Sequence, residues 1–181
     1  MLLVCSGSYH MLELGADRRL MQRLDHAAIF TMIAGTFTAI HGVAFRGRWR
    51  GTFLLIVWAL ALTGLAFKTI FFEDIPESIG LMLYLVLGGI GGLSAWGLWR
   101  SFGWAGARAL IWGGAVYSTG AAYDFFRGPA WIDGVIGAHE VFHVSVVAGM
   151  LLHWSSVRTL IGLRDQAFDA VARRVSPCLD E

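Results

Sequence analysis

Five long apolar stretches, separated by short polar connections, dominate the pattern of residues along the chain. We place them near residues 25–45, 51–72, 78–99, 108–126 and 133–156. Each holds about 19–24 residues, and a helix of that length spans the roughly 30 Å hydrocarbon core of a bilayer. The connections, such as "RGRWRG" and "FEDIPES", are too short to hold a soluble domain. Because lipid offers the backbone no hydrogen bonds, the pattern predicts an all-α, polytopic bundle of transmembrane helices.

The two ends of the chain depart from this pattern. The first ten residues, "MLLVCSGSYH", are apolar but short and lack the basic start of a signal peptide. We interpret them as the C-terminal fragment of another membrane helix, so residues 1–156 are predicted to form five full spans plus this fragment. Residues 157–181 place apolar and charged side chains on opposite sides of a helix. They predict an amphipathic or polar C-terminal tail, lying in the membrane interface or extending into water.

Composition supports a membrane protein and narrows its partners. The chain is 56% hydrophobic and 15% charged, whereas a soluble domain carries about 25% charged residues. Membrane lipids are therefore the expected surroundings. The net charge of +1 and the lack of a basic cluster exclude nucleic acid as a partner. Cys5 and Cys178 match neither a disulfide framework nor a zinc spacing, and the sequence gives no indication of oligomeric state.

Several polar residues inside the apolar stretches fall at one membrane depth when the crossings are counted. They are His10 at the end of the fragment, Asp25 at the start of the first full span, and His139 and His143 in the first two turns of the last span. His139 and His143 are four residues apart and share a helix face. With His10 they make three imidazole ligands and leave a fourth position open, as in catalytic zinc sites. Ionisable groups inside a membrane are costly, which favours a functional role.

Two more side chains complete this hypothesis. Ser6 lies four residues before His10 and therefore on its helix face. Asp25 could orient or deprotonate a water molecule at the metal, or hydrogen-bond to a ligand imidazole. Each residue also has a structural interpretation: the histidines could bond to neighbouring carbonyls or sit in the interface, and Asp25 could cap its helix. We interpret His41 and His153, at the opposite ends of their spans, as interfacial anchors.

Residues 139–143 read HEVFH, the H-E-x-x-H pattern of zinc proteases, in which Glu140 would be the general base. A protease within the membrane usually takes a further metal ligand from a later helix. No apolar stretch follows this one, so a protease is not the favoured interpretation.

Three segments resemble the hemolysin III family, within the superfamily of progestin and adipoQ (adiponectin) receptors. They are "SGSYH" at 6–10, "LDHAAIFTMIAGTFTAIHG" at 24–42, and "GAAYDFFRGP" with "AHEVFHVSVVAGMLLHW" within 120–154. The resemblance implies seven transmembrane helices and a zinc ion held by three histidines. Its S-x-x-x-H motif matches Ser6 and His10, its aspartate matches Asp25, and its H-x-x-x-H motif matches His139 and His143. The family's opening helix and most of its second are absent here, and Ala39 stands where the family often has proline.

The resemblance implies a zinc-dependent hydrolase of a lipid amide, such as ceramide, or of an ester, in the plasma (inner) membrane of a bacterium. In that mechanism Asp25 would transfer protons, and Ser6 would position the water or stabilise the oxyanion. Two alternatives remain: a pore-forming or membrane-perturbing hemolysin, and a receptor-like signalling bundle in which zinc is structural.

Overall fold

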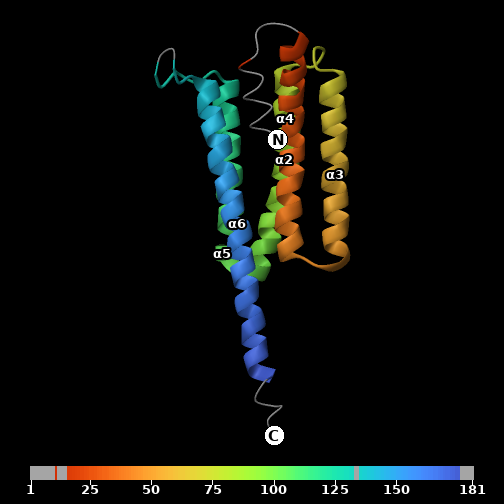
Figure 1. The fold of residues 1–181 in the computed structure, drawn as a ribbon, viewed down its shortest axis with the longest axis vertical. Helices are drawn as coiled ribbons and strands as arrows, with labels where there is room; N and C mark the ends of the chain where they lie inside the picture. The colour runs from red at the N-terminus through yellow and green to blue at the C-terminus, as the bar shows by residue number, and fades with distance from the viewer. Residues whose placement is uncertain (1–10, 12–15, 133–134, 176–181) are drawn as a thin grey trace.

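The structure is a computed structural model in which residues 11, 16–132 and 135–175 are described (Figure 1). The helices follow in the order α2 (Ala16–Ala44), α3 (Gly47–Ile70), α4 (Glu77–Gly89), α5 (Gly91–Phe125) and α6 (Ala138–Val175). Apart from an isolated bridge between Ile132 and Ile136, the described residues form no strand pairing. The predicted all-α fold is confirmed.

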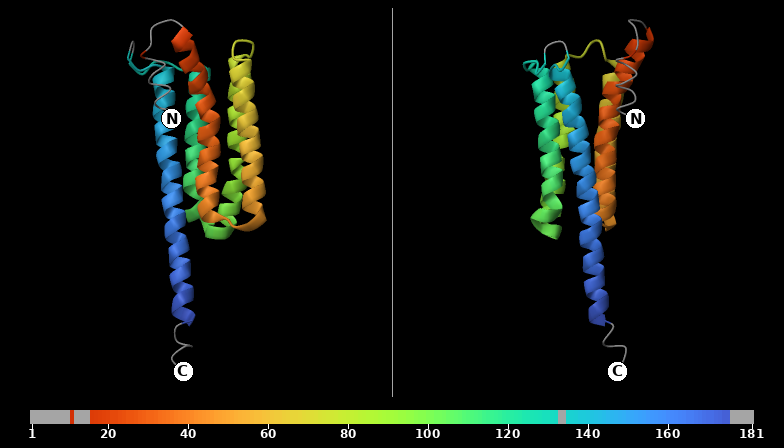
Figure 2. Two further views of the ribbon diagram at one scale, coloured as in Figure 1. Left: turned by 45° about the vertical axis from the view of Figure 1, so that its right-hand side comes forward. Right: turned by 60° about the vertical axis from the view of Figure 1, so that its left-hand side comes forward.

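The helices stand side by side, and the chain passes up and down the bundle, with α4 and the first arm of α5 running in the same direction (Figures 1 and 2). We call the end that carries the start of α2, the α3–α4 connection, the end of α5 and the start of α6 the upper end. The opposite end, with the α2–α3 connection and the first third of α5, is the lower end. At the lower end α5 turns back on itself at Gly103, whose φ of 66° and ψ of −166° are not helical. Glycine adopts this backbone conformation with little strain, which explains its presence at the reversal.

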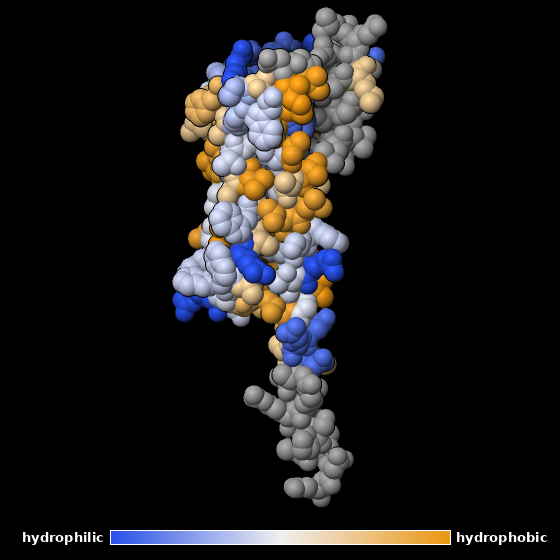
Figure 3. Space-filling model, turned by 90° about the vertical axis from the view of Figure 1, so that its left-hand side faces the viewer, coloured by the Kyte–Doolittle hydropathy of each residue, from blue (hydrophilic) through white to orange (hydrophobic). Residues whose placement is uncertain are grey.

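Four segments of the described helices are long and apolar enough to cross a membrane: Arg19–Ala44, Gly47–Ile70, Glu77–Phe125 and Ala138–Asp169. Their outer surfaces carry large exposed apolar side chains, including Leu55, Val144 and Leu151 at 71%, 67% and 60% exposure. Apolar surfaces on helices of this length indicate contact with lipid. Figure 3 shows the hydrophilic residues of one face gathered toward the upper end and around the lower end, with a mainly apolar band between them. The chain is an integral membrane protein.

Two apolar clusters hold the bundle together. In the first, Phe30, Ala34 and Phe37 of α2 pack against Val57 and Ala61 of α3. The second lies nearer the lower end and joins α2, both arms of α5 and α6. Its buried members are Ile40, Ala95, Leu98, Ala107, Leu110 and Leu160. Since α2 contributes to both clusters, it connects them, while α5 and α6 form the most extensive helix pair.

Glycines form a close seam between α5 and α6. An added Cβ would lie 2.4 Å from the His153 ring at Gly113, and 2.4 Å from the Ser145 Cβ at Gly120. On the α6 side, a Cβ at Gly149 would lie 2.9 Å from the Tyr117 ring. Small residues that permit such approach are typical of helix pairs in membranes. The seam fixes α6 against the second arm of α5.

Gly88 and Gly92, four residues apart, do not form such a seam with any described helix. A Cβ at either position would meet no described atom within 4 Å. Their neighbour Gly91 faces Phe37 instead, at 3.3 Å. All three glycines line an apolar cavity of about 250 Å³ between α2, α4, α5 and α6. Because these glycines have no side chains, they leave a cavity between the helices and do not form a close helix contact.

The helix boundaries differ from the predicted spans at their polar ends. The helix predicted from residue 25 begins at Ala16, and the one predicted from residue 133 begins at Ala138. Hydropathy locates the part of a helix that lipid surrounds, whereas a helix continues into water for as long as its hydrogen bonds are satisfied. For the same reason α6 runs unbroken past residue 156 to Val175. The predicted division into a bundle and a tail at that residue falls within one helix, and the nature of the tail stays a prediction.

Candidate metal centre

His139 and His143 lie next to each other in the first two turns of α6. Their Nε2 atoms are 3.0 Å apart, and their ring centroids are 4.5 Å apart with the planes at 83°. Two imidazoles bound to one tetrahedral zinc ion have ring nitrogens about 3.3 Å apart, since each Zn–N bond is about 2.0–2.1 Å. The observed separation is close to that value, and both rings present the same type of nitrogen. The pair therefore fits two positions in the coordination shell of one metal ion.

Asp124, near the end of α5, contacts His139 at the ring nitrogen that does not face His143. The Nδ1–H of His139 donates a hydrogen bond of 3.1 Å to Oδ2 of Asp124. Metal-binding histidines commonly donate their second ring nitrogen to a carboxylate in this way. None of the sequence motifs includes Asp124. Its position was informative nonetheless: it is a carboxylate at the end of an apolar span, and counting crossings places it at the depth of the two histidines.

Asp25 lies on α2 at the same end of the bundle. It is buried, with 9% of its surface exposed. Its carboxyl group interacts electrostatically with the His139 imidazole on α6 and with the Tyr84 hydroxyl on α4. Tyr84 itself donates a hydrogen bond of 3.1 Å to the backbone carbonyl of His26, next to Asp25. Asp25 therefore lies on a different helix but at the same end of the bundle as the histidine pair, within range for its charge to act on the His139 ring.

The other two residues of the hypothesis, Ser6 and His10, lie outside the described residues. Within the described part of the chain, no group of three or more His, Cys, Asp or Glu side chains is arranged to hold a metal ion. His139 and His143 are thus two of the three predicted ligands. The donor set present, two imidazoles with a carboxylate behind one of them, matches the chemistry of zinc and other borderline divalent metals.

Glu140, the acidic residue of the HEVFH pattern, has a structural role in this fold. Its Oε2 accepts a hydrogen bond of 2.9 Å from the backbone N–H of Gly137, directly before α6 begins. A glutamate at the third helical position that reaches back to this N–H is one half of a capping box, and it stabilises the first turn of the helix. This capping contact supports the view that the likeness to a zinc protease is incidental.

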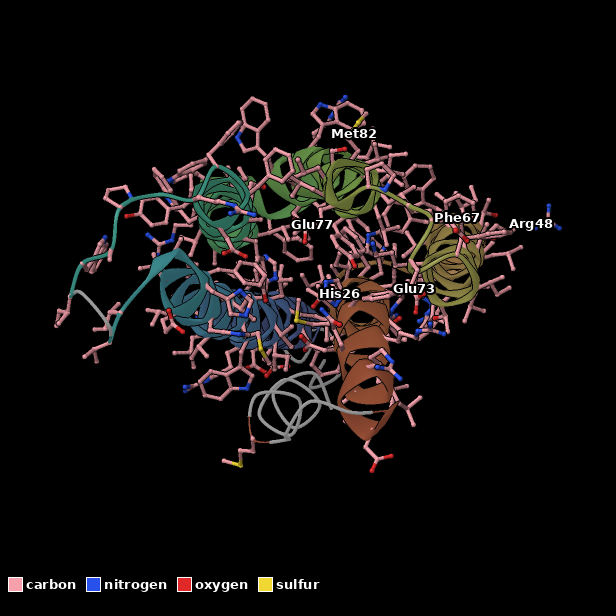
Figure 4. The ribbon with its side chains drawn as sticks, turned by 90° about the horizontal axis from the view of Figure 1, so that it is seen from above. His26, Arg48, Phe67, Glu73, Glu77 and Met82 are labelled. Carbon is pink, nitrogen blue, oxygen red and sulfur yellow. The ribbon has the colours of Figure 1, made fainter. Side chains whose placement is uncertain are left out.

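His26 and His41, two further described histidines, have contacts of their own. His26 donates from Nδ1 to the Gln22 carbonyl at 2.9 Å, and its ring meets the edge of Phe72 at 5.3 Å. Figure 4, seen from the upper end, shows His26 lying toward the interior while Arg48 and Met82 project outward. His41 is not an interfacial anchor as predicted: it is completely buried, and its Nε2 is 2.8 Å from the Ser94 hydroxyl. Counting residues along a helix gives depth but does not say which side faces the interior.

Comparison with known proteins finds similarity over most of the chain. A family model described as Haemolysin-III related matches residues 1–154. The chain is 30% identical over 149 residues to a Hemolysin-3 homolog of Bacillus subtilis (strain 168), a match that covers 82% of this chain and 67% of that protein. It is 29% identical over 131 residues to a Hemolysin-3 of Bacillus cereus, covering 72% and 57% of the two chains. The chain thus spans little more than half the length of the second relative. No solved structure matches.

Proposed function

We propose that this chain, which belongs to the haemolysin III-related family, is a zinc-dependent hydrolase. It would cleave an amide or ester bond of a membrane lipid. The observation that carries the proposal is the meeting of His139, His143 and Asp25 at one end of an apolar bundle. Polar groups placed at that depth can reach the polar bonds of a lipid, because those bonds lie where hydrocarbon gives way to headgroups.

The proposed centre uses imidazoles from both extremities of the chain. His139 and His143 would hold the ion together with His10, and Asp124 would keep the His139 ring in place. When bound, zinc supplies Lewis acidity that polarises a carbonyl and makes a water molecule a better nucleophile at neutral pH. Asp25 would accept the proton of that water and return it to the leaving group, and Ser6 would position the water or stabilise the oxyanion.

The apolar cavity between α2, α4, α5 and α6 supports a lipid substrate. It lies deeper than the histidine pair, at the level of Tyr117 and His153. Those residues are about 7 and 10 positions along their helices from Asp124 and His143, which corresponds to about 10–15 Å at 1.5 Å per residue. We infer that the acyl chain of a substrate held at the histidines extends toward this space.

We propose five membrane crossings for the described helices. The segment Glu77–Phe125 is one apolar run in the sequence, but the reversal at Gly103 turns it into two antiparallel arms. A single straight helix of that length would measure about 70 Å at 1.5 Å per residue, far more than a bilayer core. Since the named relatives are bacterial, we place the protein in a bacterial plasma membrane.

Metal content and turnover test this proposal together. We expect the protein, purified in detergent at neutral pH, to hold about one zinc ion per chain and to lose it in His139→Ala and His143→Ala. His26→Ala is the matched control, because this histidine lies at the same end with its own partners. Release of fatty acid from an N-acyl sphingoid amide or a fluorescent acyl ester should stop with the metal. Hydrolysis by a metal-free preparation would contradict the proposal.

The relatives' printed name, hemolysin, favours a second candidate, a protein that damages membranes directly. The same variants separate the two functions. Leakage of dye from lipid vesicles that persists in His139→Ala would indicate a membrane-perturbing activity independent of the metal. Leakage that disappears with the zinc would indicate that damage follows from lipid hydrolysis.

A further inference from the structure

Asp124 occupies a position that the proposed reaction does not explain by itself. It lies on α5, whereas the histidine pair lies on α6, and its Oδ2 is 3.1 Å from Nδ1 of His139. About a third of its side chain is exposed. A carboxylate at the end of a membrane span is costly unless it binds a partner. His139 is that partner, so the contact is expected to have a structural or chemical role.

The hydrogen bond is not needed to hold α5 against α6. The glycine seam already fixes these two helices, through the contacts of Gly113 with His153 and of Gly120 with Ser145. Gly120 is only one helical turn from Asp124, so the ends of the two helices are positioned without the carboxylate. The packing of α5 against α6 therefore does not explain the contact between Asp124 and His139.

The chemistry of the contact points to the ring of His139. An ionised carboxylate only accepts hydrogen bonds, so Nδ1 of His139 must carry the hydrogen. In the neutral imidazole this leaves the lone pair on Nε2, the atom that faces Nε2 of His143 at 3.0 Å. Asp124 therefore selects the tautomer and also fixes the rotation of the ring. Both are properties that a metal ligand requires.

The other described carboxylates at this end have different contacts. Glu140 accepts from the Gly137 N–H as a helix cap. Asp25 interacts with His139 electrostatically, across the bundle from α2. Among the described residues, Asp124 is the carboxylate that accepts a hydrogen bond from Nδ1 of His139.

We propose that Asp124 is a positioning residue: it holds His139 as the Nδ1–H tautomer with Nε2 turned toward the metal site. The inference rests on the proposed zinc centre and adds to it a residue outside the S-x-x-x-H, aspartate and H-x-x-x-H motifs. Loss of such a partner typically weakens metal binding by about 10–100-fold. Asp124→Leu should show a loss of that size. Asp124→Asn, whose amide oxygen still accepts a hydrogen bond but carries no charge, should fall between Asp124→Leu and the unmodified protein.

Two measurements on the full chain test this. Zinc affinity is measured by competition with a chromophoric chelator, with Asp74→Asn as the control for removing one negative charge at the same end. The hydrogen on His139 is located in the metal-free protein by ¹⁵N NMR of labelled histidine. The Nδ1–H form is expected in the unmodified protein and should be lost in Asp124→Leu. If that variant does not fold, Asp124→Asn provides the affinity measurement.

The outcomes distinguish this inference from the proposed function. If Asp124→Leu and Asp124→Asn bind zinc as tightly as Asp74→Asn, and His139→Ala does not bind it, the inference is overturned and the zinc centre stands. If the unmodified protein holds no zinc but His139 changes tautomer in Asp124→Leu, the proposed function fails and Asp124 still positions the ring. An unchanged tautomer in Asp124→Leu overturns the inference in either case.

Discussion

At the residue scale, His41 shows how this bundle accommodates a polar group in its interior. The imidazole is completely buried, yet it is stacked on Phe53 with ring centroids 3.9 Å apart and an angle of 7° between the planes. Its Nε2 pairs with the Ser94 hydroxyl at 2.8 Å. Stacking satisfies the faces of the ring, and the hydroxyl satisfies one nitrogen. The contact ties α2 to the first arm of α5.

Ser94→Ala should destabilise the protein, because it leaves Nε2 of His41 buried without that partner. Hydrogen bonds between membrane helices contribute about 0.6 kcal/mol on average and up to about 1.7 kcal/mol, so we expect a loss of about 1 kcal/mol. The measurement is reversible unfolding in mixed micelles. Ser156→Ala is the matched control, since the Ser156 hydroxyl is equally buried but has no hydrogen-bond partner among the described residues. Equal losses in the two variants would contradict the prediction.

Only part of the candidate site could be predicted from the sequence. The proximity of His139 and His143 follows from their spacing of four on a helix. The location of Asp25 at the same end follows from alternation of the crossings. Asp124 was missed because no motif includes it, and because its contact depends on how α5 rotates about its own axis. Hydropathy says nothing about that rotation.

At the scale of elements, the α5–α6 pair depends on which glycines face the partner helix. Gly113 and Gly114 are adjacent, but a Cβ at Gly113 would lie 2.4 Å from the His153 ring whereas at Gly114 it would meet no described atom within 4 Å. The sequence presents both as equivalent small residues. Only the geometry of the seam distinguishes them.

Gly113→Ala and Gly114→Ala therefore form a pair with opposite expectations. The first forces His153 or the backbone of α6 to move, and overpacking of this kind costs about 1–3 kcal/mol. The second adds a methyl group to open space and replaces glycine inside a helix, which should be neutral or stabilise by up to about 1 kcal/mol. Thermal unfolding followed by circular dichroism in detergent measures both. A Gly113→Ala variant as stable as Gly114→Ala would show that the seam is looser than described.

Element boundaries were predictable only where lipid determines them. The centre of each apolar segment lies within a predicted span, but Ala107 and Leu160, both buried in the second cluster, lie outside the predicted spans. The reversal between the third and fourth spans was predicted as a loop over "RSFGWAGAR". In the structure it is a single non-helical residue, Gly103, with helix on both sides. One glycine with positive φ is enough to reverse the chain, and a sequence rich in glycine does not reveal which one it is.

At the scale of the whole molecule, charge is distributed unequally between the two ends. Six arginines at or near the lower end are exposed: Arg46, Arg48, Arg50, Arg100, Arg108 and Arg158. Near the upper end two described arginines, Arg19 and Arg127, are exposed, whereas Lys68 is 4% exposed and Arg23 pairs with Glu73 at 2.7 Å. Exposed basic residues in short connections remain on the cytoplasmic side of a membrane. The distribution therefore predicts that the lower end lies in the cytoplasm.

This orientation leads to a prediction about the candidate site. With the lower end inside, α6 points its C-terminus into the cytoplasm, and His139 and His143 face the opposite compartment. Green fluorescent protein fused after Glu181 should fluoresce in a bacterial host, and alkaline phosphatase at the same position should be inactive. Replacing Arg46, Arg48 and Arg50 together by glutamine removes half of the exposed arginines at the lower end, so it should produce a mixture of orientations. An active phosphatase on the unmodified chain would place the histidines in the cytoplasm, where any lipid product would be released.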